Sequence, residues 1–166
     1  MRLVLYPDKI LRKKSKIASD DEAEKIYPGL ITGLITYSGL GLAAPQVGID
    51  RQIAVISAEA DESLDKPLIL LNPRILEKSG SQSIEEGCLS VTGVRAEVPR
   101  YGKIIVESGP VKKRRIIEAD GLLSIVIQHE MDHLNGILFP DHLGGFSRLK
   151  CLVKARKEKK ILGKKK

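Results

Sequence analysis

Apolar residues recur at helical spacing in three segments of the chain, and a series of short strand-like runs lies between the first and the second. In the first segment, residues 20–37, an apolar or aromatic side chain returns every three or four positions: Ile26, Leu30, Leu34 and Tyr37. This spacing predicts a helix. Pro28 and Gly29 lie inside it and disfavour helical structure, which allows a start later than Asp20.

Between residues 52 and 119 the chain is rich in Val and Ile, with turn residues between the runs, which is typical of short antiparallel strands. The expected strands cover residues 52–57, 67–76, 83–91, 94–99, 103–108 and 112–119. A loop at Gly80 separates the second run from the third, and residues 107–113 are expected to form a hairpin connection. The glycine-rich segment 38–48, before the first run, is expected to be a loop.

Asp120 and Gly121 end the strand pattern, and helical spacing then returns as far as Leu134. The positions that define this second helix are Leu122, Leu123, Val126, Ile127, Glu130, Met131 and Leu134. Asn135 and Gly136 form a good left-handed stop signal after it.

A third helix is expected near the C-terminus, over about residues 146–160. Its apolar face would consist of Phe146, Leu149, Leu152 and Val153. No internal repeat or linker interrupts the chain. The whole pattern therefore predicts an α+β fold, in which short antiparallel strands pack around the central second helix and a C-terminal helix follows.

The composition fits one globular domain. The 166 residues are 42% hydrophobic, which is enough for a single core, and no apolar run reaches the roughly 18 residues that a membrane-spanning helix needs. Two cysteines, Cys88 and Cys151, are too few for a disulfide framework. The first residues also lack the order of a signal peptide, so a cytoplasmic location without a membrane partner is expected.

The positive charge of the chain is concentrated at its C-terminal end. Between Arg148 and Lys166 there are ten Lys or Arg residues and one acid, a net charge of +9, so the total of +7 leaves −2 for the rest. We therefore divide the chain into a body, residues 1–147, and a basic C-terminal helix or tail, residues 148–166. Such a tail is either a solvated helix end or a surface that attracts a polyanion such as RNA.

The second predicted helix contains the sequence QHEMDHLNG, in which His129, Glu130 and His133 form an HExxH pattern. Residues four apart on a helix lie one above the other, so both imidazoles can bind one metal ion. Glu130 is next to the first of these ligands and can reach a water molecule at the metal. The alternative is a pair of histidines that are hydrogen-bonded in the core.

A catalytic metal site of this kind needs a third protein ligand. The protease pattern that continues as HxxGxxH is excluded, because Phe139 stands where its third histidine is required. The glutamate that another protease class uses further along is also missing, since the region around Val153 is basic and apolar. Two candidates remain, each with a purely structural alternative. His142 would have to fold back past Pro140, and Cys88 offers a thiolate, which binds iron, zinc or nickel strongly.

A third motif, GLGLAAPQ, spans residues 39–46. It matches the dinucleotide fingerprint GxGxxA in its letters only, because a helix precedes it and Pro45 would break the helix that must follow. We therefore expect no nucleotide cofactor. The small residues instead allow another backbone to lie alongside, and the side-chain amide of Gln46 is expected to point into a site.

The motifs GLGLAAPQ, EGCLS (residues 86–90) and QHEMDHLNG, in this order, resemble the three signature motifs of the peptide deformylases. The resemblance covers about Leu3 to Leu143. It implies an enzyme that removes the formyl group from the N-terminal formyl-methionine of newly synthesised polypeptides and releases formate. It also implies one divalent metal ion, natively Fe²⁺, with Zn²⁺ or Ni²⁺ able to use the same ligands.

The resemblance also implies the role of each motif residue. The metal ligands would be Cys88, His129 and His133. Glu130 would be the general acid and base. The Gln46 side-chain amide and the Leu89 backbone N–H would form the oxyanion hole, which stabilises the negative charge that develops during the reaction.

For the substrate, the resemblance implies an extended peptide that lies against Leu40 and Gly41. Ile125 and Val126 would contribute to the pocket for its methionine. Thr92 departs from the family pattern, which usually has proline there, so the resemblance does not fix the shape of the substrate groove.

The family docks near the ribosomal exit tunnel through a C-terminal helix, so the resemblance also implies that the basic tail contacts ribosomal RNA. The residues expected at this contact are Lys154, Arg156, Lys157, Lys159 and Lys160. Two other functions stay open: a metallopeptidase acting on other amide bonds, and a catalytically inactive relative that binds ribosomes or metal. Glu130 and Gln46 argue against the inactive relative, because neither is needed merely to hold a metal ion.

Overall fold

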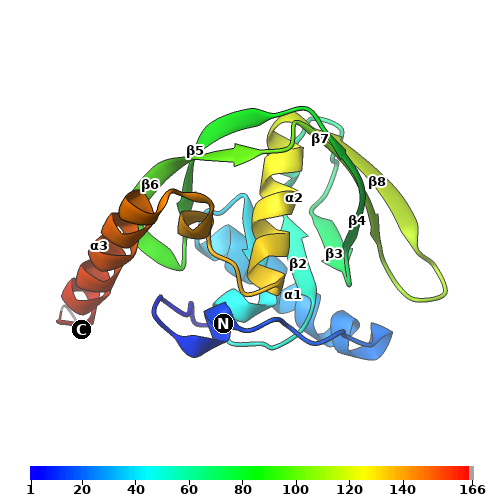
Figure 1. The fold of residues 1–166 in the computed structure, drawn as a ribbon. Coiled ribbons are helices and arrows are strands. Elements are labelled where there is room, and N and C mark those ends of the chain that lie inside the picture. The colour runs from blue at the N-terminus through cyan, green and yellow to red at the C-terminus, as the bar shows by residue number, and fades with distance from the viewer. Residues whose placement is uncertain (165–166) are drawn as a thin grey trace.

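The computed structural model describes residues 1–164, with side chains described as far as Ile161. Within these residues, helix α2 (Gly121–Leu134) crosses the middle of the molecule, and eight strands and two further α-helices are arranged around it (Figure 1). None of the helices in this described part is both long and apolar enough to cross a membrane. The predicted α+β fold, with strands around a central helix and a C-terminal helix, is confirmed.

Helix α1 (Asp20–Thr36) starts before the Pro28–Gly29 pair, not after it. A capping box fixes its first turn, because Ser19 Oγ accepts a hydrogen bond from the Glu22 amide and the Glu22 carboxylate accepts one from the Ser19 amide. Pro28 lies on the exposed side of the helix, where a proline is tolerated best. The opposite side is buried at Ala23, Leu30, Gly33 and Leu34.

The strands form three antiparallel sheets. The first has the order β1 (Gly41–Ala43), β2 (Ile53–Ile56), β3 (Leu68–Leu71). The second has the order β4 (Arg74–Ser79), β7 (Lys103–Ser108), β8 (Arg115–Asp120). The third is a hairpin of β5 (Gln82–Cys88) and β6 (Val91–Arg100), whose far end lies beside the C-terminal helix (Figure 1).

Two of the expected strands are each divided in the structure. The run 67–76 is broken at Asn72, which has a positive φ of 47° and is held by two hydrogen bonds between its side chain and the backbone of Ala18, at 2.9 and 2.8 Å. Its two halves belong to different sheets, as strands β3 and β4. The run 83–91 is broken by a two-residue turn at positions 89–90, so Cys88 ends a strand at a tight turn.

Helix α2 is buried over most of its surface, because the strands lie around it. One side belongs to a core cluster that includes Ala54, Ile56, Leu70, Ile104, Val106, Leu123, Ile127, Met131 and Leu134. The helix begins directly after β8 at Gly121, and it ends at Asn135 with Gly136 in the left-handed conformation (φ 73°), as predicted. A helix held in this way supports its functional side chains rigidly.

Helix α3 (Gly145–Lys164) packs against β6, but not through the face that its apolar spacing predicts. Phe146, Leu149 and Val153 are 81%, 61% and 42% exposed, so this part of the prediction is wrong. Ala155 is buried instead. It belongs to a cluster with Tyr6, Val91, Val94, Val98, Phe139 and the partly buried Leu152. The small side chain lets the helix approach the sheet closely, which the spacing of large apolar residues does not reveal.

Candidate metal centre

Helix α2 and the β5–β6 hairpin bring three ligand-type side chains together. His129 and His133 are one turn apart on α2, and Cys88 is the last residue of β5. The potential ligand atoms of these residues all lie within 4.8 Å of one another, and Cys88 Sγ is 3.2 Å from His133 Nε2. Of the two candidates for a third ligand, the structure therefore brings Cys88 to the pair of histidines.

His142, the other candidate, is engaged elsewhere. Its Nε2 is 2.7 Å from Asp132 Oδ2 and 3.3 Å from Arg100 Nη1. Phe139, three residues before it, is buried and stacks against the His129 ring, with 6.4 Å between the ring centroids. The residue that excluded a protease pattern thus packs against a predicted ligand.

A buried chain of ion pairs holds His129 in place. Its Nδ1 is 2.8 Å from Glu86 Oε2, and Glu86 also accepts two hydrogen bonds from Arg100, at 2.7 and 3.0 Å. Arg100 also forms an ion pair with Asp132, with 2.6 Å between Nη1 and Oδ2. Because the Glu86 carboxylate accepts a hydrogen bond from Nδ1–H, the Nε2 of His129 is left free to bind a metal. Burial raises the pKa of Glu86, but the hydrogen bonds from His129 and Arg100 lower it to about 2 overall.

The surroundings of Cys88 favour its thiolate form. Burial alone would raise the pKa of the thiol, but the adjacent His133 and His129 hold it well below its ordinary value. The backbone N–H of Ser90 also points at the sulfur, at 3.4 Å. A thiolate is the form of cysteine that binds metal ions.

Glu130 lies beside the three ligand-type residues and is buried against Gly41. Burial is the main cause that raises the pKa of its carboxyl to about 7, with His129 and His133 opposing the change. The carboxyl can therefore both accept and return a proton near neutral pH.

The three donor residues suit a divalent metal ion. One thiolate and two imidazoles supply three ligands and leave a position open for water or substrate, as in catalytic zinc-type sites. Among the described residues, Glu130 Oε2 and His133 Nδ1 are buried without a hydrogen-bond partner. A divalent ion with a water molecule beside it fits both the ligands and the unpartnered carboxylate oxygen.

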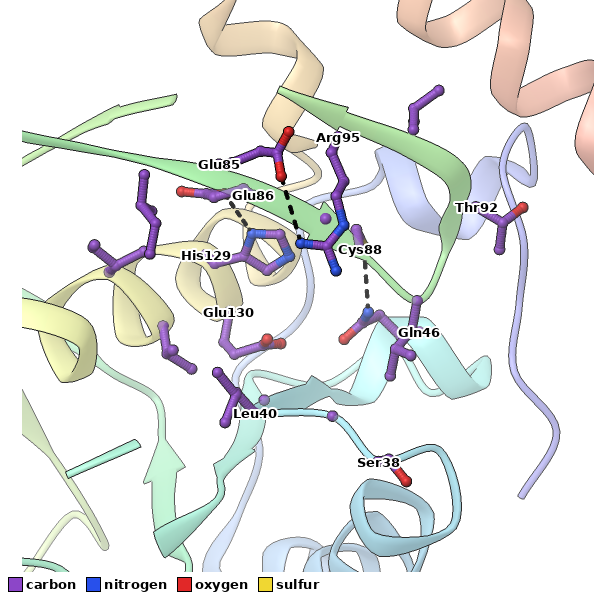
Figure 2. A pocket seen from close by; sticks show the side chains of 18 of the residues that line it. Ser38, Leu40, Gln46, Glu85, Glu86, Cys88, Thr92, Arg95, His129 and Glu130 are labelled. Carbon is purple, nitrogen blue, oxygen red and sulfur yellow. Dashed lines mark hydrogen bonds and ion pairs between the residues drawn. The ribbon is translucent and has the colours of Figure 1, made fainter. Parts of the chain in front are cut away.

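The expected loop 38–48 contains strand β1 and a short 3-10 helix, η2 (Ala44–Val47), and together these fix the orientation of Gln46. Its Oε1 accepts a hydrogen bond from the Ala43 amide at 2.8 Å, so its Nε2 points towards Cys88 Sγ, at 3.7 Å (Figure 2). The side chain is buried and points into the site, as predicted from the sequence.

All of these elements open onto one cavity of about 1010 Å³. Its walls include the residues that the sequence analysis assigned to the substrate and the oxyanion hole: Leu40, Gly41, Gln46, Leu89, Ile125 and Val126. Cys88, His129 and Glu130 line it as well (Figure 2). Glu86, Arg95 and Lys154 also line the cavity. Lys154 was expected only as a contact to RNA, and the other two were not expected at the site. Of these three residues, only Glu86 could have been noticed from the sequence, because it is an acidic residue two positions before Cys88.

The family model of the polypeptide deformylases matches residues 1–148. The chain belongs to this family. It is 45% identical to the peptide deformylase of Buchnera aphidicola subsp. Schizaphis graminum over 163 residues, which cover 96% of each chain. It is 41% identical to that of Hydrogenovibrio crunogenus over 159 residues, which cover 94% of this deformylase and 93% of its relative.

Solved structures of deformylases have the same fold. The crystal structure from Legionella pneumophila superimposes with a TM-score of 0.87 at 32% identity, covering 98% of this chain and 96% of the other. The structure from Synechococcus elongatus, in complex with actinonin, has a TM-score of 0.83 at 39% identity, covering 95% and 87%. The chain is thus a metal-dependent hydrolase that removes the N-formyl group from nascent peptides, and its Cys/His/His site is typical of deformylases.

Proposed function

We propose that Cys88, His129 and His133 hold a single divalent ion, Fe²⁺ in the cell, and that Glu130 moves the protons of the deformylation reaction. The observation that carries this proposal is one cavity in which three ligand atoms within 4.8 Å of one another lie beside a buried carboxyl with a pKa of about 7. The thiolate makes iron a suitable ion, although Zn²⁺ or Ni²⁺ would fit the same ligands.

The residues of the site have separate roles in breaking the formyl C–N bond. When bound, the ion supplies Lewis acidity, which polarises the formyl oxygen and lets water react near neutral pH. Glu130 accepts a proton from the attacking water and then donates a proton to the leaving amine nitrogen. Its position between β1 and α2 keeps the carboxyl away from bulk water during both transfers.

Gln46 and the backbone N–H of Leu89 are proposed to stabilise the oxygen that becomes negative in the transition state. Gln46 supports this role because its amide is already fixed by Ala43 and needs no reorganisation. Leu89 occupies the tight turn directly after Cys88, so its N–H belongs to the same rigid hairpin.

The peptide itself is proposed to lie along Leu40 and Gly41, with its methionine side chain at Ile125 and Val126. All four residues line the cavity. Ile125 and Val126 lie one turn before His129 on α2, so an apolar side chain placed there brings the preceding formyl group close to the ligands.

Metal analysis and one substitution test these roles. Anaerobic purification is expected to yield an equimolar amount of iron. Glu130→Gln should keep its metal but lose about 10²- to 10⁴-fold in formate release from formyl-Met-Ala-Ser, because proton transfer is lost. Glu118→Gln, on strand β8, is a matched control that should stay active. Full activity of Glu130→Gln would show that another group moves the protons.

We further propose that residues 148–166 form a ribosome-binding element of a cytoplasmic enzyme whose catalytic body is residues 1–147. Lys154, Lys157 and Lys160 are exposed on α3 and available to RNA. Two of the expected contact residues are instead partly engaged within the chain. Arg156 donates to the Tyr6 hydroxyl at 3.3 Å, and Lys159 donates to the Leu5 carbonyl at 3.1 Å.

Charge reversal tests the ribosome proposal better than truncation, because truncation would also remove the buried Ala155. The double variant Lys157→Glu/Lys160→Glu should lose co-sedimentation with ribosomes at low salt. Lys112→Glu, an exposed cation on the body, should retain it. Unchanged co-sedimentation of the double variant would refute the proposal.

A further inference from the structure

A second cavity, of about 600 Å³, lies at the C-terminal end of helix α2. Its walls come from the N-terminal segment, the junction between β3 and β4, the turn between β7 and β8, and the last turn of α2. It shares no lining residue with the cavity of the metal centre. Pockets that hold small organic molecules have volumes of roughly 300–1,000 Å³, so this cavity is large enough for one.

Both buried and exposed apolar side chains line this second cavity. Met131 and Leu134 belong to the core and offer an apolar surface at the end of α2. Ile17 and Val111 also line the cavity, although their side chains are 67% and 75% exposed. A bound apolar group would remove this surface from water, which is favourable.

The charges around the second cavity favour an anion. Three cations, Lys14, Arg74 and Arg114, line it together with one acid, Glu107. Arg114 neutralises that acid, with 3.0 Å between Arg114 Nη2 and Glu107 Oε2. Lys14 and Arg74 are exposed, and neither forms an ion pair with any residue whose side chain the structure describes. The cavity therefore has an excess of two positive charges, which attracts negative charge.

Hydrogen bonds hold the walls of the second cavity together. Arg114 Nη1 donates to the carbonyl oxygens of Asn72 and Gly109, at 3.1 and 3.0 Å, and so joins the β3–β4 junction to the β7–β8 turn. The Asn72 side chain is in turn bound to the backbone of Ala18, at 2.9 and 2.8 Å. Because these segments are already fixed, a ligand would lose little free energy in ordering them.

The end of α2 does not offset the attraction for an anion. The C-terminus of a helix is partly negative because its last carbonyl groups lack partners within the helix. In α2, the carbonyl oxygens of Met131, Asp132, His133 and Leu134 all accept backbone hydrogen bonds. The hydrogen bond to Leu134 comes from the Ser15 amide, at 2.9 Å. These donors reduce the negative potential at the cavity.

We propose that the second cavity binds a small organic anion, a carboxylate with an apolar body. The apolar body would lie against Met131 and Leu134, and Lys14 and Arg74 would bind the carboxylate. The cations favour this ligand over an uncharged or positively charged molecule of the same size, and the apolar walls favour it over a small hydrophilic anion. The inference does not depend on the proposed peptide path or catalytic roles, because the two cavities share no residue.

Titration of the ¹⁵N-labelled zinc form, followed by NMR, tests this site with octanoate, octylamine and acetate as probes. Octanoate should saturably shift the amide resonances of Ser15, Val111 and Met131. It should bind at least about tenfold more tightly than octylamine, which has the opposite charge, or acetate, which lacks the apolar chain. Arg74→Glu and Lys14→Glu should each weaken octanoate binding by about three- to tenfold and leave formate release unchanged.

Lys78→Glu is the matched control, because it makes the same change of charge on the same strand as Arg74, at an exposed residue that does not line the second cavity. It should bind octanoate as the wild type does. Equal binding of octanoate and octylamine, or unchanged binding in Arg74→Glu, would overturn the proposal. Octanoate shifts confined to residues of the metal cavity, such as Gly41 and Ile125, would overturn it as well.

Discussion

Gly41 is packed so closely against Glu130 that strand β1 has no room for a side chain there. A Cβ on residue 41 would lie 2.7 Å from both Cγ and Cδ of Glu130, which is closer than real atoms approach. The same contact buries Glu130, and burial is the main cause of its raised pKa. One glycine therefore helps to set both the position and the proton affinity of the Glu130 carboxyl.

Gly41→Ala should consequently damage catalysis more than stability or metal binding. Displacing Glu130 by about 1 Å is expected to lower kcat/KM for formate release by about 10²-fold. Gly144→Ala is the matched control, because a Cβ there meets nothing within 4 Å, and this variant should remain fully active. Wild-type kinetics for Gly41→Ala would mean that the carboxyl does not need this position.

Glu86 is expected to govern how tightly the ion is held. Glu86→Gln removes the charge that orients His129 and pairs with Arg100, so metal affinity should fall by about 10- to 100-fold. Competition with a chelator on the zinc form measures this directly. Glu85→Gln, the exposed neighbour, should keep the wild-type affinity, and an equal loss in both variants would contradict the role of Glu86.

Residue-level prediction succeeded where neighbours in space are also related by a regular spacing. His129 and His133 follow from the helical repeat, and Cys88 from its motif. The link from Glu86 to Arg100 and on to Asp132 could not be predicted in this way. Ion pairs between residues 14 and 32 positions apart leave no periodic signal, and only the fold brings them together.

At the scale of elements, α1 tolerates a proline that its sequence position makes unfavourable. The capping box at Ser19 and the buried side of the helix offset the cost. Pro28→Ala should therefore raise the free energy of unfolding by about 1–3 kcal/mol, since it restores a backbone donor and removes the clash of the ring. Urea unfolding checks this, with Lys25→Ala on the exposed surface of the same helix as a control that should change little.

Helix α3 shows the limit of apolar spacing as a guide to packing. The existence of a helix was predicted, but the face that packs was wrong. Contact is made by the small Ala155, and Arg156 and Lys159 reach back to the N-terminal segment. Long cationic side chains can cover apolar surface with their stems, so a helix rich in lysine can still pack tightly. The breaks in the strands at residues 72 and 89–90 were not predicted for a similar reason. A turn within a strand-like run does not change the composition of that run.

At the scale of the whole molecule, Asp141 links the N-terminal segment of the chain to helix α3. It pairs with Arg12 near the N-terminus and with Arg148 on α3 at 2.8 Å, and it accepts a hydrogen bond from the Leu138 amide at 2.9 Å. Partial burial raises the pKa of Asp141, but these partners together hold it below its ordinary value of 3.8.

This shift predicts how stability depends on pH. Because the pKa is lower in the folded state, the stabilisation from Asp141 is present in full well above the unfolded pKa of about 3.9. It declines as the pH falls below that value and is lost through the lowered folded pKa. Asp141→Asn should cost about 1–2 kcal/mol at pH 7 and progressively less as the pH falls below about 3.9. Thermal unfolding across this range checks it. Asp65→Asn, at an exposed loop residue, should track the wild type at every pH.

The order of the elements along the chain has a consequence for the moment at which activity begins. The thiolate of β5 is synthesised well before the two imidazoles of α2, and α3, which completes the cavity wall, follows later still. During synthesis the N-terminal elements emerge first, so the β5–β6 hairpin leaves the ribosome without the helix that completes its metal centre. A growing chain that stops short of α2 therefore contains the cysteine of the metal centre without its two histidines.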